Sequence, residues 1–118
     1  MSKAKAGIPN DEWELEKLRS NRELGVEYLK VALESLTHPD ERAGGLLALR
    51  SIAEAYGGLG AVAAKAGISR ESLYRSLSPK GNPTLKTLIA ILKTLDLRLS
   101  ITQAPKKKPA RTSRKLAA

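Results

Sequence analysis

The sequence predicts an all-α domain, and three observations support that prediction. Apolar residues recur at intervals of three and four in several stretches of the 118-residue chain, as on helices with one buried face. Phenylalanine is absent and aromatic residues make up only 3% of the chain, so the core must be built from Leu, Ile, Val and Ala. Glycine and proline separate the periodic stretches, which indicates about five or six short helices joined by turns.

The first two predicted helices lie in the N-terminal third of the chain. A helix beginning at Asn10 or Asp11 has acidic residues in its first turn, where the helix dipole favours negative charge. Its Trp13 is expected to be an apolar packing anchor beside Leu18 rather than a ligand-stacking residue. The second helix covers residues 22–36. Its apolar face consists of Tyr28, Leu29, Ala32, Leu33 and Leu36.

The third predicted helix covers residues 41–56 and should support the helices that follow. Gly44 and Gly45 weaken its first turn, so we expect the helix to begin properly only at Leu46. Its apolar side consists of Leu46, Leu49, Ile52, Ala53 and Tyr56. His38, the only histidine, lies in the turn before this helix and is interpreted as a plain turn residue.

The most specific stretch is residues 59–77, which predicts two short helices joined by a tight turn. Gly67 ends the first helix, because the sharp turn needs a left-handed residue and glycine adopts that conformation without steric cost. Ser69 is expected to cap the second helix by accepting from the N–H of Glu71 or Ser72. The inward face consists of Leu59, Val62, Ala63 and Ala66 on the first helix and Leu73 and Leu77 on the second.

The spacing within this stretch matches what a helix-turn-helix needs. Ala63 is the small residue where two helices cross, Gly67 follows four positions later, and Leu73 is apolar six positions further on. Ser76 stands where a larger apolar residue is common, and Leu77 is expected to make that contact instead. The alternative is a helical hairpin of the core with no role in DNA binding.

A turn-rich loop and a further helix follow. Asn82 is expected to be the N-cap of a helix of residues 84–95, with Pro83 at its first position. The expected apolar face of that helix consists of Leu85, Leu88, Ile89, Leu92 and Leu95.

Residues 97–102 change to the alternating pattern of a half-buried strand, with Leu97, Leu99 and Ile101 on one side. A lone strand leaves its backbone groups unpaired, and the chain contains no second convincing strand. The simplest partner is the same strand of a second subunit, which predicts a two-fold homodimer. The alternative is an extended tail that lies on the domain.

Charge is distributed unevenly along the chain. Residues 1–42 carry a net charge of −2, residues 43–103 carry +5 and residues 104–118 carry +6. We therefore expect a flexible leader (1–9), a helical domain (10–103, with its core at 41–96) and a basic disordered tail (104–118). The alternative for the tail is a solvated segment without a binding role. Positive charge concentrates where a polyanion would be met.

Composition excludes several classes of function. The chain has no cysteine and one isolated histidine, so we expect no enzyme activity, no metal site and no cofactor. No apolar run approaches the roughly 20 residues that span a bilayer, and the N-terminus lacks a signal-peptide pattern. The expectation is a cytoplasmic protein without a membrane partner.

Residues 27–101 resemble the antidote proteins of toxin–antitoxin addiction modules that carry a lambda-repressor-like (Xre-type) helix-turn-helix. The resemblance lies in Glu27–Leu29, Ala32–Glu34, Gly67–Pro83 and Leu92–Leu99, and Gly67–Pro83 is its most specific part. It implies a lambda-repressor-like helical bundle in a bacterial or phage protein. It also implies binding to the protein's own promoter and to a cognate toxin, typically a basic RNA-cleaving protein.

The helix of residues 70–77 is expected to be the recognition helix that enters the major groove of double-stranded DNA. The candidates for base contacts are Arg70, Glu71, Ser72, Tyr74 and Arg75. The candidates for phosphate contacts are Lys65, Ser69, Ser78, Lys80, Asn82, Thr84 and Lys86. Two alternatives remain open: a protein-interaction module that binds a toxin or partner without reading DNA, and a stand-alone phage-type repressor.

Overall fold

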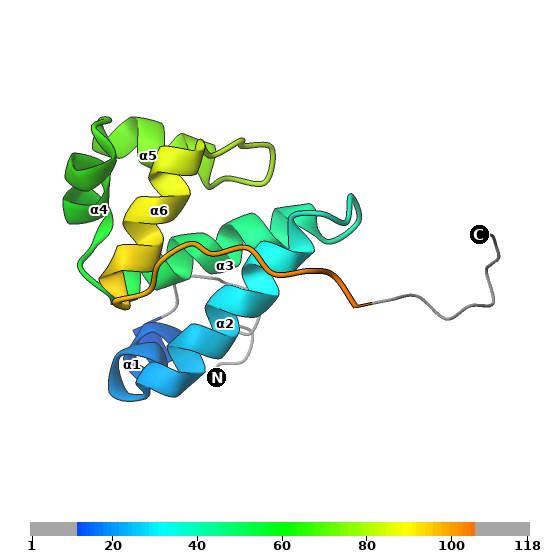
Figure 1. Cartoon of the computed structure of the whole chain (residues 1–118). Helices are drawn as coiled ribbons and strands as arrows, with labels where there is room; N and C mark the ends of the chain where they lie inside the picture. Colours follow the sequence, from blue (N-terminus) through cyan, green and yellow to red (C-terminus); the bar gives the residue numbers. More distant parts are fainter. Residues whose placement is uncertain (1–11, 106–118) are drawn as a thin grey trace, which may run out of the picture.

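The computed structural model describes residues 12–105, which form six helices and no strand (Figure 1). The helices are α1 (Glu12–Ser20), α2 (Arg22–Ser35), α3 (Arg42–Ala55), α4 (Leu59–Ala66), α5 (Arg70–Ser76) and α6 (Leu85–Thr94). The all-α prediction is therefore confirmed for these residues. The predicted leader, and the tail from residue 106 onward, lie outside the described residues.

Helix α3 is the centre of the domain. It contacts α1 and α2 on one side and α4 and α6 on the other, as Figure 1 shows. Leu46, Leu49 and Ile52 expose no surface, and burying each such side chain stabilises the fold by about 1.5–3 kcal/mol. The predicted apolar side of this helix is confirmed.

The start of α3 differs from the prediction, because the helix begins at Arg42 and not at Leu46. Gly45 is buried in the contact with α2, where an added Cβ would lie 2.7 Å from the Ala32 carbonyl oxygen. The glycine that weakens the isolated helix is thus what allows α2 and α3 to approach closely. Tertiary packing outweighs the local propensity at this helix start.

The role predicted for Trp13 is wrong. Its side chain is 67% exposed, and the Lys17 ammonium lies 4.9 Å from the ring centroid. The buried residues of α1 are Leu15 and Leu18. A nine-residue helix presents only one narrow face to the bundle, and the two leucines occupy it.

Two tyrosines attach α1 to the rest of the domain. The Tyr28 hydroxyl donates to the Glu14 carboxylate, and the Tyr56 hydroxyl donates to the Leu18 carbonyl. Burial raises the pKa of Tyr28, and the hydrogen bond to Glu14 and the charge of that carboxylate raise it further. Burial also raises the pKa of Tyr56, although the charge of Arg22 opposes the rise. Both tyrosines therefore stay protonated beyond their ordinary range.

Helix α6 departs from the prediction at its cap and on its buried face. The N-cap is Thr84, whose hydroxyl accepts from the Thr87 N–H at 3.2 Å, and not Asn82. The helix buries Thr87, Ala90, Ile91 and Leu92, whereas Leu85 is 59% exposed. The run of apolar residues from 88 to 92 offers more than one apolar face, and packing against α4 selects among them.

The strand predicted at residues 97–102 is absent from this chain. Helix α6 ends at Thr94, Asp96 has a φ of 60°, and the Leu97 N–H donates to the Leu92 carbonyl at 3.0 Å. Leu97 packs against the core, whereas Ile101 is 95% exposed. A strand needs a paired neighbour, and residues 12–105 provide none.

Gly81 offers a test of the packing around the loop after α5. We expect Gly81→Ala to lower the free energy of unfolding by about 1–3 kcal/mol, because an overpacked site forces the backbone to shift. The added Cβ would lie 2.1 Å from the Ser76 carbonyl oxygen and 2.6 Å from that of Arg75. Urea unfolding of the two proteins measures the difference.

Gly60→Ala is the matched control for this substitution. Gly60 lies in α4, and a Cβ there would meet nothing within 4 Å. Alanine is the better helix former, so this variant should be more stable than the original by about 0.5–1 kcal/mol. Equal stability of the two variants would show that Gly81 is not closely packed.

The two tyrosines predict a loss of stability at alkaline pH. Both pKa values are raised above the unfolded value of about 10, so the protonated tyrosines contribute fully below pH 10. Above pH 10 the unfolded chain releases these protons first. The free energy of unfolding then falls by at most about 1.4 kcal/mol per pH unit for each tyrosine.

Urea unfolding at pH 8 and at pH 11 measures this effect. In Tyr28→Phe the decline should be smaller than in the unmodified protein, because one of the titrating hydroxyls is gone. An identical decline in both proteins would assign the pH dependence to other groups.

Candidate nucleic-acid interface

The turn between α4 and α5 has the predicted geometry. Gly67 adopts a left-handed conformation with a φ of 75°. The Ile68 N–H donates to the Ala63 carbonyl at 3.0 Å and the Gly67 N–H donates to Ala64 at 3.1 Å, which is the Schellman arrangement of a helix end. The Ser69 hydroxyl accepts from the Ser72 N–H at 3.0 Å. The predicted stop at Gly67 and cap at Ser69 are both confirmed.

Helix α5 has one buried side and one exposed side. Leu73 and Leu77 expose no surface, although Leu77 is the C-cap and the helix ends at Ser76, one residue earlier than predicted. Leu77 thus lies in the core as expected, while the Ser76 hydroxyl donates to the Leu73 carbonyl at 2.9 Å. The exposed residues of α5 are Arg70, Glu71, Tyr74 and Arg75.

These four exposed side chains line one pocket of about 540 Å³, together with Glu54, Leu59 and Ser78. The structure therefore brings together four of the five residues predicted to contact bases. The fifth, Ser72, is half-buried, and its hydroxyl lies 3.1 Å from that of Ser69. The pocket combines cationic, anionic and aromatic groups, which are the types that recognise base edges in the major groove.

The residues predicted to contact phosphates fall into two groups. Lys65, Lys80 and Lys86 are exposed and form no ion pair within residues 12–105. The other four already have partners in the protein. Ser69 caps α5, Thr84 caps α6, Ser78 accepts from Arg50, and Asn82 accepts from Arg42.

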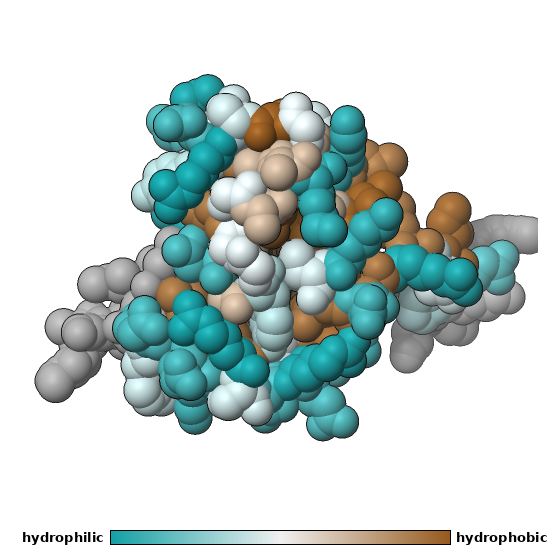
Figure 2. All heavy atoms as spheres, turned by 90° about the vertical axis from the view of Figure 1, so that its left-hand side faces the viewer, coloured by the Kyte–Doolittle hydropathy of each residue, from teal (hydrophilic) through white to brown (hydrophobic). Residues whose placement is uncertain are grey.

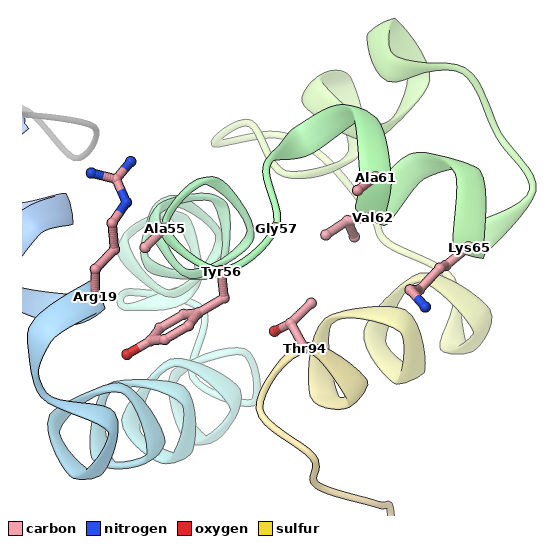
Figure 3. Close-up of a pocket in the computed structure, with 8 residues that line it drawn as sticks. All are labelled: Arg19, Ala55, Tyr56, Gly57, Ala61, Val62, Lys65 and Thr94. Carbon is pink, nitrogen blue, oxygen red and sulfur yellow. The ribbon is translucent and has the colours of Figure 1, made fainter.

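Lys65 lies apart from the α5 pocket. It lines a different pocket of about 440 Å³, together with Arg19, Tyr56 and Thr94. Figure 3 shows that the polar groups of this second pocket do not converge, because the Arg19 guanidinium points away from the other lining residues. Arg19 instead pairs with Glu12 at 3.0 Å. This pocket has the features of a surface depression rather than of a ligand site.

Sequence reasoning missed two arginines of α3. Arg42 donates to the Gly81 carbonyl at 3.2 Å and to the Asn82 side chain at 3.1 Å. Arg50 is 8% exposed and donates to Tyr74 and Ser78. A signal for Arg50 was present, because it lies four residues after Leu46 and next to Leu49, within the apolar side of α3.

A third pocket, of about 560 Å³, lies between α2 and α3. We call it the α2–α3 groove. Apolar residues line it, including Leu24, Tyr28 and Val31, and the acidic residues at its edge are Glu27, Asp40 and Glu41. Leu24 and Val31 are among the exposed large apolar residues of the structure. The groove is therefore apolar with an acidic rim.

The rest of the chain that the structure describes adds no metal site. On the face that Figure 2 shows, a band of residues of intermediate hydropathy lies between patches of strongly hydrophilic side chains. Residues 12–105 bring no three His, Cys, Asp or Glu side chains together as a metal site. Within the same residues, no single helix is long and apolar enough to cross a membrane. Only α3 and α4 together reach that length and composition, and the chain bends by 103° between them.

Comparison with known proteins identified a family and a relative of this chain. The model of a family described as "Probable addiction module antidote protein" matches residues 11–103. An uncharacterized protein of Haemophilus influenzae is 37% identical over 78 residues, which cover 66% of this chain and 79% of the relative. No solved structure matches this chain.

Proposed function

The chain belongs to the family of probable addiction module antidote proteins, and we propose that it is an antitoxin that binds double-stranded DNA at its own promoter through α5. Family membership also implies a cognate toxin as a partner. The arrangement of α4 and α5 supports the DNA-binding part of the proposal.

The observation that carries the proposal is the division of α5 into two faces. Leu73 fixes the helix to the core, which leaves four polar and charged side chains exposed on the other side. An α-helix with its side chains is about 10–12 Å in diameter, which fits a major groove roughly 12 Å wide. Arg70 and Arg75 suit guanine O6 and N7, and Glu71 suits the amino group of cytosine.

The charge of the flanking residues also favours DNA. Lys80 lies in the loop that joins α5 to α6 and Lys86 lies in the first turn of α6, and both ammonium groups are free of ion pairs within the described chain. Residues 43–103 carry a net charge of +5, although the N-terminal third is acidic. Cations beside a recognition helix hold the phosphates and set the register of the protein on the duplex.

We further propose that the protein binds DNA as a two-fold homodimer. Leu99 and Ile101 are exposed large apolar residues in an extended segment that has no partner strand in residues 12–105. Pairing with the same segment of a second copy would satisfy the backbone and cover both side chains. A two-fold protein matches the two half-sites of a palindromic operator. Leu97 contributes less to such a pairing than predicted, because it packs against its own core.

The α2–α3 groove favours a second function, the capture of a partner protein without DNA readout. Its exposed apolar residues and acidic rim suit a partner that presents a basic and apolar surface. In an antitoxin the two functions are compatible, because α5 and the groove use different residues. The DNA experiment below separates the two functions.

Substitutions in α5 and in the following loop test DNA reading. We expect Arg75→Met to relax the preference at one base pair, with a loss of roughly 1–3 kcal/mol for the promoter only. Lys80→Met should weaken binding to every sequence and reduce the salt dependence by about one phosphate contact. Titration of promoter and random duplexes across a salt series measures both effects.

The unmodified protein is the reference in this experiment. If Arg75→Met and Lys80→Met weakened promoter and random DNA equally, Arg75 would not read a base. Equal and weak binding of the unmodified protein to both duplexes would leave the net charge of +9 as its only source of affinity. The protein-capture function would then replace DNA reading.

The dimer is tested with a charge in the extended segment. Ile101→Asp places a carboxylate directly in the proposed pairing, so the fraction of dimer at micromolar concentration should fall by about tenfold or more. Sedimentation equilibrium measures it. Trp13→Asp is the control, because Trp13 is also an exposed large apolar residue but lies on α1. A dimer that persists in Ile101→Asp would exclude pairing through this segment.

A further inference from the structure

We propose that Arg50 of α3 is a positioning residue for DNA recognition, because it holds Tyr74 of α5 and Ser78 of the following loop in fixed orientations without touching DNA itself. This inference rests on the proposed DNA-binding function. Arg50 would then be a determinant of sequence specificity that lies beneath the exposed side of α5.

The geometry of Arg50 is that of a clamp. Its guanidinium lies over the Tyr74 ring, with the central carbon 4.0 Å from the ring centroid. One terminal nitrogen donates to the Tyr74 hydroxyl at 3.2 Å and the other donates to the Ser78 hydroxyl at 2.9 Å. The Ser78 hydroxyl in turn donates to the Tyr74 carbonyl at 2.8 Å. Arg50 thus binds the side chains of Tyr74 and Ser78 at the C-terminal end of α5, and Ser78 also binds the backbone of Tyr74.

The burial of the Arg50 guanidinium is energetically unfavourable, so its contacts with α5 need an explanation other than stability. Arg50 is 8% exposed, and its Nε is buried without a hydrogen-bond partner among the described residues. A buried guanidinium loses its hydration, and here it recovers only part of that loss through two neutral hydroxyls and one ring. An apolar residue at this place in α3 would pack without that cost. The arrangement is better explained by the orientation that it imposes on α5 than by stability.

Tyr74 is the residue through which Arg50 acts. It is 48% exposed and lines the α5 pocket with Arg70, Glu71 and Arg75. The guanidinium covers one side of the ring, so the remaining surface of the ring faces the pocket and the solvent. The planar guanidinium stacks on the Tyr74 ring and also donates to its hydroxyl. Together these two contacts restrict both side-chain torsions of the tyrosine. The ring is then presented to a thymine methyl or a phosphate without an ordering cost on binding.

Arg50 has little direct access to DNA. Its terminal nitrogens are engaged with Tyr74 of α5 and with Ser78 just after it, and a residue buried to this degree adds no phosphate contact of its own. Its loss should therefore change the preference between sequences while the salt dependence of binding stays the same. This combination separates a positioning residue from a phosphate-binding lysine such as Lys80.

The test uses Arg50→Met and Arg50→Lys, each alone and combined with Tyr74→Ala, in the full chain. The measured quantity is the affinity for the promoter duplex divided by that for a random duplex, at several salt concentrations. We expect Arg50→Met to lower this ratio by about tenfold with an unchanged salt slope. Arg50→Lys keeps the positive charge but loses the planar guanidinium, so the affinity ratio of this variant should fall by a similar factor.

The Tyr74→Ala background distinguishes positioning from a general structural role. If Arg50 acts through Tyr74, Arg50→Met has no further effect on the ratio once the ring is absent. A merely structural role predicts the same additional loss in both backgrounds. Lys30→Met is the control for charge, because it removes one exposed cation from α2 and should leave the ratio unchanged.

Each outcome has a defined meaning. An unchanged ratio in Arg50→Lys and Arg50→Met, additive losses with Tyr74→Ala, or a smaller salt slope in Arg50→Met overturns this inference while DNA reading by α5 stands. If Arg50→Met does not fold, Arg50→Lys decides alone. A ratio near one in the unmodified protein overturns the proposed function and this inference together.

Discussion

The burial of α3 is the constraint on which the rest of the structure depends. This helix contacts α1, α2, α4 and α6, and its central leucines and isoleucine are inaccessible to solvent. In a chain with no phenylalanine and few aromatic residues, closely packed aliphatic side chains must supply nearly all of the apolar burial. The small residues at the contacts, Gly45 of α3 and Ala63 of α4, follow from that requirement.

The same helix links the core to the candidate DNA-binding surface. Arg42 binds the loop that follows α5, and Arg50 binds the C-terminal end of α5 itself. Leu73 of α5 and its C-cap Leu77 are buried in the core, so α5 is held by apolar contacts on one face and by the Arg50 contacts at its C-terminal end. A seven-residue helix has little stability of its own, so α5 depends on its contacts with the core and with the arginines of α3.

Two surfaces of the molecule differ in charge. The α5 pocket and its flanking lysines are the place where the described residues offer cations to a polyanion. The α2–α3 groove combines apolar residues with acidic ones and suits a different kind of partner. An antitoxin that binds both DNA and a toxin needs two such surfaces, and the uneven charge of the sequence already separates them.

The sequence by itself determined the helical class, the turn at Gly67, the cap at Ser69 and the exposed residues of α5, because each depends on local backbone preferences or on helical period. Only the tertiary structure decided which face of α6 is buried, since the apolar run 88–92 fits several faces and contact with α4 chooses one. It also decided that Trp13 is exposed and that residues 97–102 form no strand in a single chain. The Arg50 contacts with Tyr74 and Ser78 join residues 24 and 28 positions apart, a distance at which local sequence patterns carry no information.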